Sequence, residues 1–280
     1  MSIKRLVFCV LAGSLAAAAA DWPQWRGPER DGISQESGLL QKWPEGGPPL
    51  AWKATGLGEG FASVAVAGGR VITQGQAGGG QAVITFDEAT GRQLWKAPNG
   101  DAYLNRRGGG PRGTPTIDGD FVYTLSKTGK AYCFVAATGD VVWVKDLKRL
   151  YKVSVPSWGV ASSPFIHDDR VVFNGGPRGG ALNKKTGTRK WKTGTDKAGY
   201  ATPVPYDHNG KDAVVMFSRR YAYGVDLSNG RQLWSKSFKS SADVNAADPV
   251  IYNGKFFITS NSRDGELFEL RGNSTRSKWK

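Results

Sequence analysis

One short phrase recurs along this chain at nearly constant spacing, and it limits what the chain can fold into. A Thr-Gly or Asn-Gly pair is followed by a tryptophan four residues after the glycine, as in Ala89–Trp95. The glycines of the phrase are Gly91, Gly139, Gly187 and Gly230. Their tryptophans, with one more on either side, recur every 43 to 48 residues: Trp52, Trp95, Trp143, Trp191, Trp234 and Trp279. A period of this size is typical of stacked supersecondary units.

Each unit has the pattern of four short antiparallel strands. In the second unit, alternating apolar runs at Phe121–Leu125 and Lys130–Val135 are followed by the Thr-Gly turn and the strand that carries the tryptophan. A four-stranded sheet cannot bury both of its faces alone, so successive sheets must pack face to face. We therefore predict an all-β fold, a β-propeller of four-stranded antiparallel blades over residues 50–280, with about five blades present.

The number of strands predicts an incomplete ring. Six tryptophan-bearing outer strands accompany five inner triplets, which begin near Ala62, Thr114, Ser162, Ala201 and Ala247. A propeller closes neatly when outer strands and inner triplets are equal in number. We expect either a truncated sequence or a chain that needs another chain to close its ring.

Residues 1–20 have the pattern of a secretory signal peptide. Two basic residues precede an apolar stretch that ends near Leu15, and alanines offer small residues for cleavage before Asp21. A membrane anchor is the alternative, but the apolar part is short for a bilayer span. Cys9 lies inside the apolar stretch and not at the cleavage point, which argues against a lipid anchor. We predict an exported protein, periplasmic or extracellular, without a transmembrane segment after signal removal.

The chain is basic, with 38 Lys and Arg, 24 Asp and Glu, and a formal net charge of +14. An exported protein without a basic helix is not expected to bind nucleic acid. The excess charge is instead a solvated surface, or it attracts an envelope protein or an anionic envelope polymer. After signal removal Cys133 is the only cysteine, and we expect a small buried hydrophobe there.

Residues 21–49 precede the first full unit and are rich in Trp, Pro and Gly. Proline disfavours a helix at the residue before it, and tryptophan side chains anchor a chain on an apolar surface. We predict an extended N-terminal segment that is pinned by its aromatic residues and lies across the outside of the propeller.

The repeat itself carries a family resemblance. The pattern Asp-x-x-Thr-Gly-x-x-x-Trp, found at Asp87–Trp95 and with small changes at Asn183–Trp191 and Asp226–Trp234, resembles the repeat of the pyrroloquinoline-quinone (PQQ) propeller superfamily. Residues 21–28, together with residues 110–115 and 246–249, are similar to exported PQQ-binding-like β-propeller repeat proteins, whose relatives include the BamB outer-membrane assembly factor and quinoprotein alcohol dehydrogenases. The resemblance implies the propeller fold and tryptophans that dock between neighbouring blades. It leaves function open, because one repeat serves both enzymes and scaffolds.

The repeat also has a physical basis. The Asp or Asn accepts backbone hydrogen bonds in the turn, the glycine adopts positive φ, and the tryptophan presents a large apolar face. Val135 replaces the Asp in the second unit, and the last unit has two extra residues before Trp279. We expect looser turns at both places.

Aligning the units places one polar residue of each in the same position: Ser63, Thr114, Ser163, Thr202 and Asp248. Four of the five are followed by proline, which belongs at a sheet edge, so we predict a ring of polar groups on the inner strands at the channel mouth. The loops just ahead contribute Arg112, Trp158, Tyr200 and Asn245. A ligand or cofactor site is predicted here, formed by these four residues and Asp248. In the alternative, the hydroxyls satisfy local backbone groups and the channel holds water.

No complete catalytic set stands out. His167 and His208 fall in turns between first and second strands, and the sequence has neither a zinc set at ligand spacing nor a haem-attachment motif. A quinoprotein dehydrogenase needs a carboxylate base and a Ca²⁺ bound by hard oxygen ligands, of which Asp248 and Asn245 offer a part. The adjacent cysteine pair of many alcohol-oxidising relatives is absent. We therefore predict a non-catalytic binding or protein-interaction scaffold; the alternative is a PQQ-dependent alcohol dehydrogenase with calcium, for which Asp248 is the candidate catalytic residue.

Overall fold

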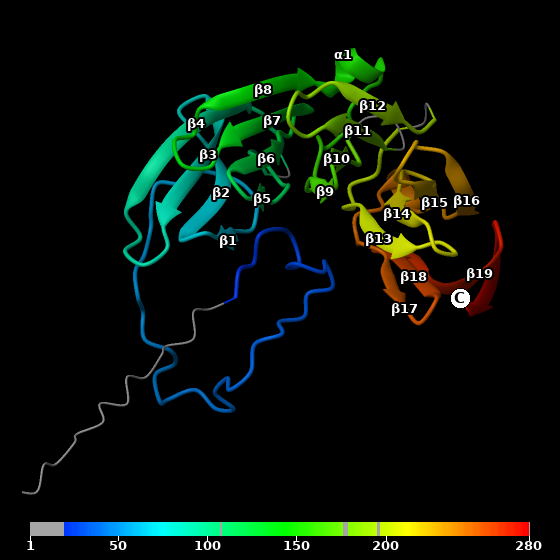
Figure 1. Cartoon of the computed structure of the whole chain (residues 1–280), viewed down its shortest axis with the longest axis horizontal. Helices are drawn as coiled ribbons and strands as arrows, with labels where there is room; N and C mark the ends of the chain where they lie inside the picture. Colours follow the sequence, from blue (N-terminus) through cyan, green and yellow to red (C-terminus); the bar gives the residue numbers. More distant parts are fainter. Residues whose placement is uncertain (1–19, 107, 176–178, 195–196, 280) are drawn as a thin grey trace, which may run out of the picture.

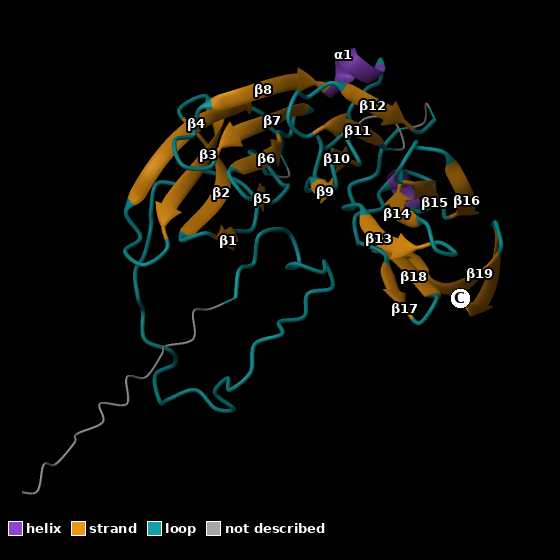
Figure 2. Ribbon diagram, viewed as in Figure 1, coloured by secondary structure: helices purple, strands orange, loops and turns teal. Residues whose placement is uncertain are grey.

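The computed structural model describes residues 20–106, 108–175, 179–194 and 197–279. The predicted signal peptide lies outside the described residues, except for its last alanine. Five four-stranded antiparallel sheets follow one another along an arc (Figure 1, Figure 2). The predicted all-β fold of propeller blades is confirmed.

The blades follow chain order. Blade 1 is β1 (Ala65–Ala67), β2 (Arg70–Ala77), β3 (Gly80–Asp87) and β4 (Gln93–Asp101). Blade 2 is β5 (Thr116–Asp118), β6 (Phe121–Leu125), β7 (Lys130–Val135) and β8 (Val141–Asp146). Blade 3 is β9 (Phe165–His167), β10 (Arg170–Phe173), β11 (Gly180–Asn183) and β12 (Arg189–Lys192). Blade 4 is β13 (Val204–Asp207), β14 (Asp212–Phe217), β15 (Tyr221–Asp226) and β16 (Gln232–Ser237). Blade 5 is β17 (Val250–Tyr252), β18 (Lys255–Ser260), β19 (Arg263–Arg271) and β20 (Ser274–Trp279). Two short helical turns, α1 (Leu147–Tyr151) and η1 (Ser241–Asp243), lie in the loops that join blades.

A bulge sets the direction of the repeat tryptophan in every blade. In blade 2, Cys133 opposes Trp143 while the next residue, Phe134, opposes Val141, so one residue before the tryptophan is left unpaired. The same shift occurs at the equivalent place in the other four blades. A bulge bends its strand locally. The tryptophan side chains therefore project from equivalent positions of the outer strand in all five sheets.

Four tryptophans dock on a turn of the blade that follows them. The indole Nε1–H donates to a backbone carbonyl of that turn at 2.8 to 2.9 Å, from Trp52, Trp95, Trp143 and Trp191. The glycine of each receiving turn has φ between +67° and +79°, and an added Cβ would lie 2.5 to 2.8 Å from the indole. Both the backbone and the close approach therefore require glycine. We call this contact the tryptophan–glycine lock.

Two expectations about the turns need correction. The turn after Val135 keeps its backbone hydrogen bond, from Gly139 N to Val135 O at 2.8 Å, so loss of the Asp side chain does not open it. The last turn is tighter and not looser: β19 runs on to Arg271, and only Gly272 and Asn273 separate it from β20. The Trp234 Nε1–H donates to Tyr206 Oη of its own blade at 2.7 Å and not to this short hairpin, although the indole still packs on Phe256 and Phe268 of blade 5.

The predicted sixth outer strand is wrong. Trp52 makes the tryptophan–glycine lock but lies in no strand. The part of the chain that the structure describes before Ala65 contains no inner triplet, so the residues around Trp52 have no ladder to join. Five outer strands thus accompany five inner triplets.

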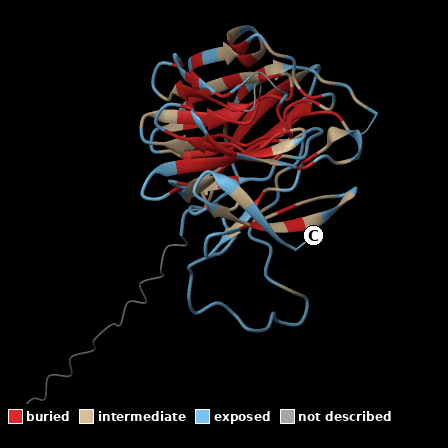
Figure 3. Ribbon diagram, turned by 90° about the vertical axis from the view of Figure 1, so that its right-hand side faces the viewer, coloured by how far each residue is buried: buried red, intermediate tan, exposed pale blue. Residues whose placement is uncertain are grey.

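The core lies between successive blades and not within them. Four apolar clusters each combine side chains of two neighbouring blades, as the face-to-face prediction requires. Representative pairs are Val83 with Val122, Leu125 with Phe173, Val172 with Val214, and Val215 with Phe256. Buried residues accordingly concentrate in the strands, while blade 5 near the C-terminus is largely intermediate or exposed (Figure 3).

The arc does not close within the described residues. No strand of blade 5 pairs with a strand of blade 1, and Trp279 in the outermost strand of blade 5 is 52% exposed. Whether further residues or another chain complete the ring stays a prediction. In the described ranges, no helix is long and apolar enough to cross a membrane.

The first part of the N-terminal segment, residues 22–30, lies inside the arc, so its predicted position on the outside is wrong there; the exposed residues that follow loop away from the blades (Figure 1). Trp22 pairs with Val66 of β1 through backbone hydrogen bonds of 2.7 and 2.9 Å, and Pro23 O accepts from Ile117 N of β5 at 2.8 Å. The inner strands are sheet edges whose backbone groups face the channel. The segment supplies partners that these edges would otherwise lack.

Candidate functional site

The five aligned polar residues form a chain of hydrogen bonds that joins all five blades. In each step, a backbone N–H of one blade donates to a side-chain oxygen of the next. The steps run from Ser63 to Thr114 Oγ1 (3.2 Å), from Thr114 to Ser163 Oγ (2.8 Å), from Ser163 to Thr202 Oγ1 (3.3 Å) and from Thr202 to Asp248 Oδ1 (2.7 Å). The residues that the alignment placed in one position are thus neighbours in space, and four of their side-chain oxygens connect successive blades.

Asp248 ends this chain and also meets the N-terminal segment. Trp25 Nε1–H donates to Asp248 Oδ2 at 2.6 Å, so both carboxylate oxygens accept a hydrogen bond. Burial raises the pKa of Asp248 above its ordinary value, and the two hydrogen bonds and the charge of Arg30 oppose this rise.

Arg30 occupies the channel. Its side chain donates to Pro164 O at 2.6 Å and to Pro203 O at 3.0 Å, and its guanidinium carbon lies 5.0 Å from the Phe165 ring centroid. Burial lowers the pKa of Arg30 to about 9, an effect that Asp248 opposes, so the side chain stays charged at neutral pH. The N-terminal segment thus contacts all five blades: blade 1 through Trp22, blade 2 through Pro23, blades 3 and 4 through Arg30, and blade 5 through Trp25. Repeat alignment missed Arg30 because the residue lies outside the repeats.

The four predicted loop residues gather at one end of the channel. The Trp158 and Tyr200 ring centroids are 5.8 Å apart, and Tyr200 Oη accepts from Trp158 N at 3.3 Å. Tyr200 N donates to Asn245 O at 2.9 Å. Arg112 lies over the Phe61 ring at 4.5 Å and is close enough to influence the Tyr200 hydroxyl electrostatically.

Lys127 is a further cation at this end that the alignment did not select. It is buried, its Nζ donates to Gly108 O at 2.8 Å, and the same atom lies 4.1 Å from the Tyr103 ring centroid. Burial lowers the pKa of Lys127 to about 8; the charge of Arg112 adds to this effect, and Glu59 opposes it.

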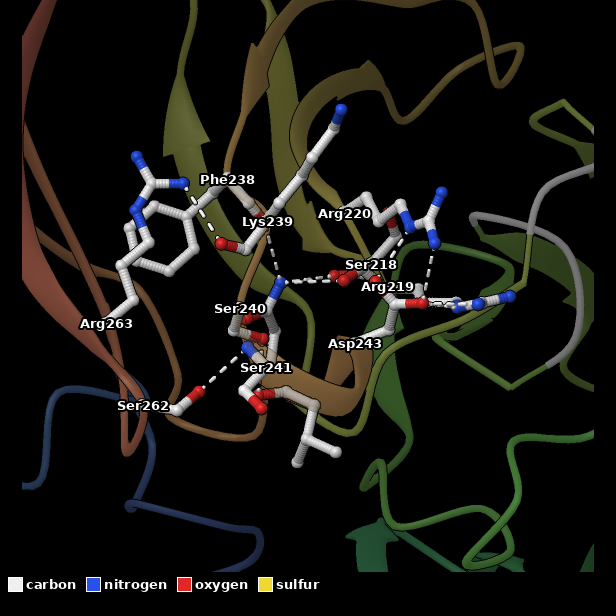
Figure 4. Close-up of polar contacts among 12 residues, drawn as sticks. Ser218, Arg219, Arg220, Phe238, Lys239, Ser240, Ser241, Asp243, Ser262 and Arg263 are labelled. Atoms are coloured by element: carbon white, nitrogen blue, oxygen red, sulfur yellow. Dashed lines mark hydrogen bonds and ion pairs between the residues drawn. The ribbon is translucent and has the colours of Figure 1, made fainter.

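Asn245 clamps the loop that enters blade 5. Its buried amide Nδ2 donates to three carbonyls: Ser218 (3.0 Å), Arg219 (3.1 Å) and Phe238 (3.2 Å). Two residues earlier, Asp243 accepts from Arg219 Nε at 2.6 Å and from Arg220 Nε at 2.7 Å (Figure 4). Hydrogen bonds from Arg220 and then Arg219 hold the pKa of Asp243 below its ordinary value.

The same loop has a strained backbone. Ala242 and Asp243 both have φ of 55°, in the left-handed region that non-glycine residues rarely adopt. The paired arginines hold Asp243 in place, so the polar contacts in Figure 4 maintain the strain. No sequence pattern predicted this role of Asp243.

Two cavities lie at this end of the channel, and they differ in size. One of about 460 Å³ is lined by the loops that enter blades 1 and 2, including Phe61 and Gly108. The other, of about 100 Å³, lies beside Tyr200, between Pro156, Ser157, Arg219 and Asp243. Ligand pockets generally measure about 300–1,000 Å³. A three-ring quinone therefore does not fit the cavity beside Tyr200, whereas the cavity beside Phe61 is within the usual size range.

The residues at the mouth also do not fit a calcium centre. Ca²⁺ takes about six to eight oxygen ligands, whereas both Asp248 oxygens already accept N–H groups. Asn245 Oδ1 is buried without a hydrogen-bond partner in the described part of the chain, but it is a single amide oxygen. Across the described residues, no group of three or more His, Cys, Asp or Glu side chains could hold a metal ion.

Consecutive four-stranded blades joined by the tryptophan–glycine lock define a β-propeller of the PQQ-like repeat class. The sequence model of one family, described as outer membrane protein assembly factor BamB, matches residues 79–280. The chain belongs to this family. No curated protein matches the sequence.

Solved structures show the same class of fold. BamB from Moraxella catarrhalis is 18% identical, with a TM-score of 0.56 over 78% of this chain and 62% of that one. A europium-containing methanol dehydrogenase is 14% identical, with a TM-score of 0.56 over 75% of this chain and 53% of that one. Quinohemoprotein alcohol dehydrogenase from Comamonas testosteroni is 14% identical, with a TM-score of 0.60 over 90% of this chain and 47% of that one. This chain thus spans less than two thirds of each of these proteins, and at these identities the likeness concerns the fold alone.

Proposed function

We propose that this chain is an exported, non-catalytic PQQ-like propeller that acts as a binding or protein-interaction scaffold in the periplasm or cell envelope. The state of Asp248 carries this proposal. A catalytic base must be within hydrogen-bond reach of the proton that it removes, but both oxygens of Asp248 are taken by Trp25 and Thr202. Arg30 occupies the adjoining channel.

Two further observations support a scaffold. The family description names an assembly factor, and the neighbour from Moraxella catarrhalis carries the same name. The positive net charge favours encounter with an acidic envelope protein or an anionic envelope polymer.

A titration distinguishes the scaffold from the alternative PQQ-dependent alcohol dehydrogenase. The chain from residue 21 is purified, its cooperative melting is verified, and PQQ with Ca²⁺ is added while tryptophan fluorescence and dye-linked alcohol oxidation are followed. We expect no saturable quenching and no oxidation. Saturable quenching that persists in Asp140→Asn and disappears in Asp248→Asn would overturn the proposal and identify the mouth as a cofactor site.

Export is a separate part of the proposal. Fractionation of cells that express the full chain should place it outside the cytoplasm, whereas a variant without residues 2–20 should stay inside. Export would be contradicted if the full chain and the shortened variant were found in the cytoplasmic fraction in equal proportion.

A further inference from the structure

The join between blades 4 and 5 is built differently from the other joins. Trp234 donates its hydrogen bond to Tyr206 of its own blade and not to the turn of blade 5, which is shortened to Gly272 and Asn273. A cavity of about 460 Å³ opens at this join, on the face of the propeller opposite the mouth. Its lining combines the apolar side chains of Tyr206, Ile251, Phe256 and Leu270 with polar ones, among them the exposed Asp207. Its size falls within the usual range for ligand pockets.

A second cavity continues the first and has a different character. It measures about 240 Å³ and shares His208 and Asn209 with the apolar cavity. Lys211 and Arg231 line it, both are exposed, and no acidic side chain contributes to its described lining. Neither cation lies within ion-pair distance of a carboxylate in the described part of the chain. Arg231 is nevertheless close enough to Asp226 to act on it electrostatically, and both cations also line a neighbouring cavity with Asp168, Asp212 and Asp226. We call the two cavities together the blade 4–5 groove.

The aromatic residues of the groove are held rigidly. Tyr206 meets Phe256 edge-on, with ring centroids 5.3 Å apart and an interplanar angle of 87°, and Phe256 stacks on Phe268 at 5.3 Å. Tyr206 Oη accepts from Trp234 and lies 3.4 Å from His208 Nδ1. Phe256 is 2% exposed, so an aromatic side chain entering this cavity would contact mainly the partly exposed Tyr206 ring, which the packed rings behind it hold in place.

We propose that the blade 4–5 groove binds an extended polypeptide segment that carries an aromatic side chain next to an acidic one. The aromatic side chain enters the apolar cavity, and the carboxylate pairs with Lys211 and Arg231. The side-chain amide of Asn209, which lines both cavities, offers donors and an acceptor to the segment's backbone. Asn273 lines the second cavity, where its Oδ1 lies 3.3 Å from His208 Nε2. This inference rests on the proposed scaffold function and specifies the chemistry of its partner.

The proposal is tested by calorimetric titration of the chain from residue 21 with the unlabelled peptide acetyl-Gly-Ser-Phe-Glu-Gly-Ser-amide. We expect saturable binding that weakens at least about fivefold when the peptide's Phe becomes Ala or its Glu becomes Gln. Lys211→Glu and Arg231→Glu should weaken binding by a similar factor. Lys96→Glu, which changes an exposed cation on β4 of blade 1, is the matched control and should leave binding unchanged.

A charge swap keeps the test independent of folding defects. Lys211→Glu should bind the peptide with Lys in place of Glu more tightly than the original peptide does. Leu270→Trp, which fills the apolar cavity, should abolish binding while a cooperative melt verifies folding. Absence of wild-type binding, an unchanged affinity in both charge variants, or an equal affinity for 3-phenylpropionate would overturn the proposal. If the peptide does not bind and PQQ does not bind either, the groove proposal fails but the scaffold function is not contradicted. If PQQ binds, the scaffold function is rejected, whether or not the peptide binds.

Discussion

Replacing Gly139 with alanine tests whether the tryptophan–glycine lock stabilises the propeller. Gly139 has φ of +79°, and an added Cβ would lie 2.7 Å from the Trp95 indole, which is 9% exposed. A left-handed backbone costs about 1–2 kcal/mol for a residue with a Cβ. Overpacking against the buried indole costs about 1–3 kcal/mol more. We therefore expect Gly139→Ala to lower the free energy of unfolding by about 2–5 kcal/mol.

Gly119→Ala is the matched control in the same blade. Gly119 has φ of +56°, and an added Cβ meets nothing within 4 Å. This variant should lose only the backbone contribution of about 1–2 kcal/mol, and the effect of alanine on the unfolded chain is common to both variants. Urea unfolding followed by circular dichroism measures the two losses. Equal destabilisation would refute the argument that the indole contact makes glycine necessary.

Three further predictions concern buried or strained side chains. Arg30→Ala removes donors to two blades and one of the two cationic neighbours of Asp248, so stability should fall by about 3–5 kcal/mol in thermal melts. Lys42→Ala, which removes an exposed cation of the same segment, should have a much smaller effect, and equal effects would contradict a special role for Arg30. The two arginines that bind Asp243 lower its pKa, so its stabilisation is complete above the unfolded pKa of about 3.9 and is lost as pH falls through the lower folded value. Asp243→Asn should therefore lose less stability on acidification than the unaltered chain in urea titrations between pH 6 and 3, and parallel acid limbs would count against the pairing. Burial raises the pKa of Cys133 to about 12, so a thiol reagent should label it only as fast as the chain unfolds, and rapid labelling of the folded protein would show that the thiol is accessible.

Local sequence accounts for the blades and for their relation to one another. The turn at Gly91, the strand that carries Trp95 and the inner-edge residue Thr114 recur in each unit, because every blade must bury the same two faces against its neighbours. Aligning the units therefore located the polar residues that form the hydrogen-bonded chain at the mouth. The same alignment misjudged Trp52, because it assigned a strand from the repeat pattern without an inner triplet to receive it.

The contents of the channel could not be predicted from the repeats. The hydrogen bond between Trp25 and Asp248 joins residues 223 positions apart, and no local pattern connects them. If the N-terminal segment lay outside the propeller, Asp248 would have a free carboxylate oxygen at the channel mouth. Because Trp25 of that segment reaches Asp248, the carboxylate is instead part of the structure.

The repeat sequence by itself determined the blade architecture, its order and the positions of the repeat tryptophans, because strand pairing and turn geometry act over short distances along the chain. Tertiary structure decided what fills the channel, which joins are locked and where a groove opens. At the blade 4–5 join, a hairpin reduced to Gly272 and Asn273 leaves Trp234 to find Tyr206. That outcome depends on how two blades meet in space, and spacing along the chain does not encode it.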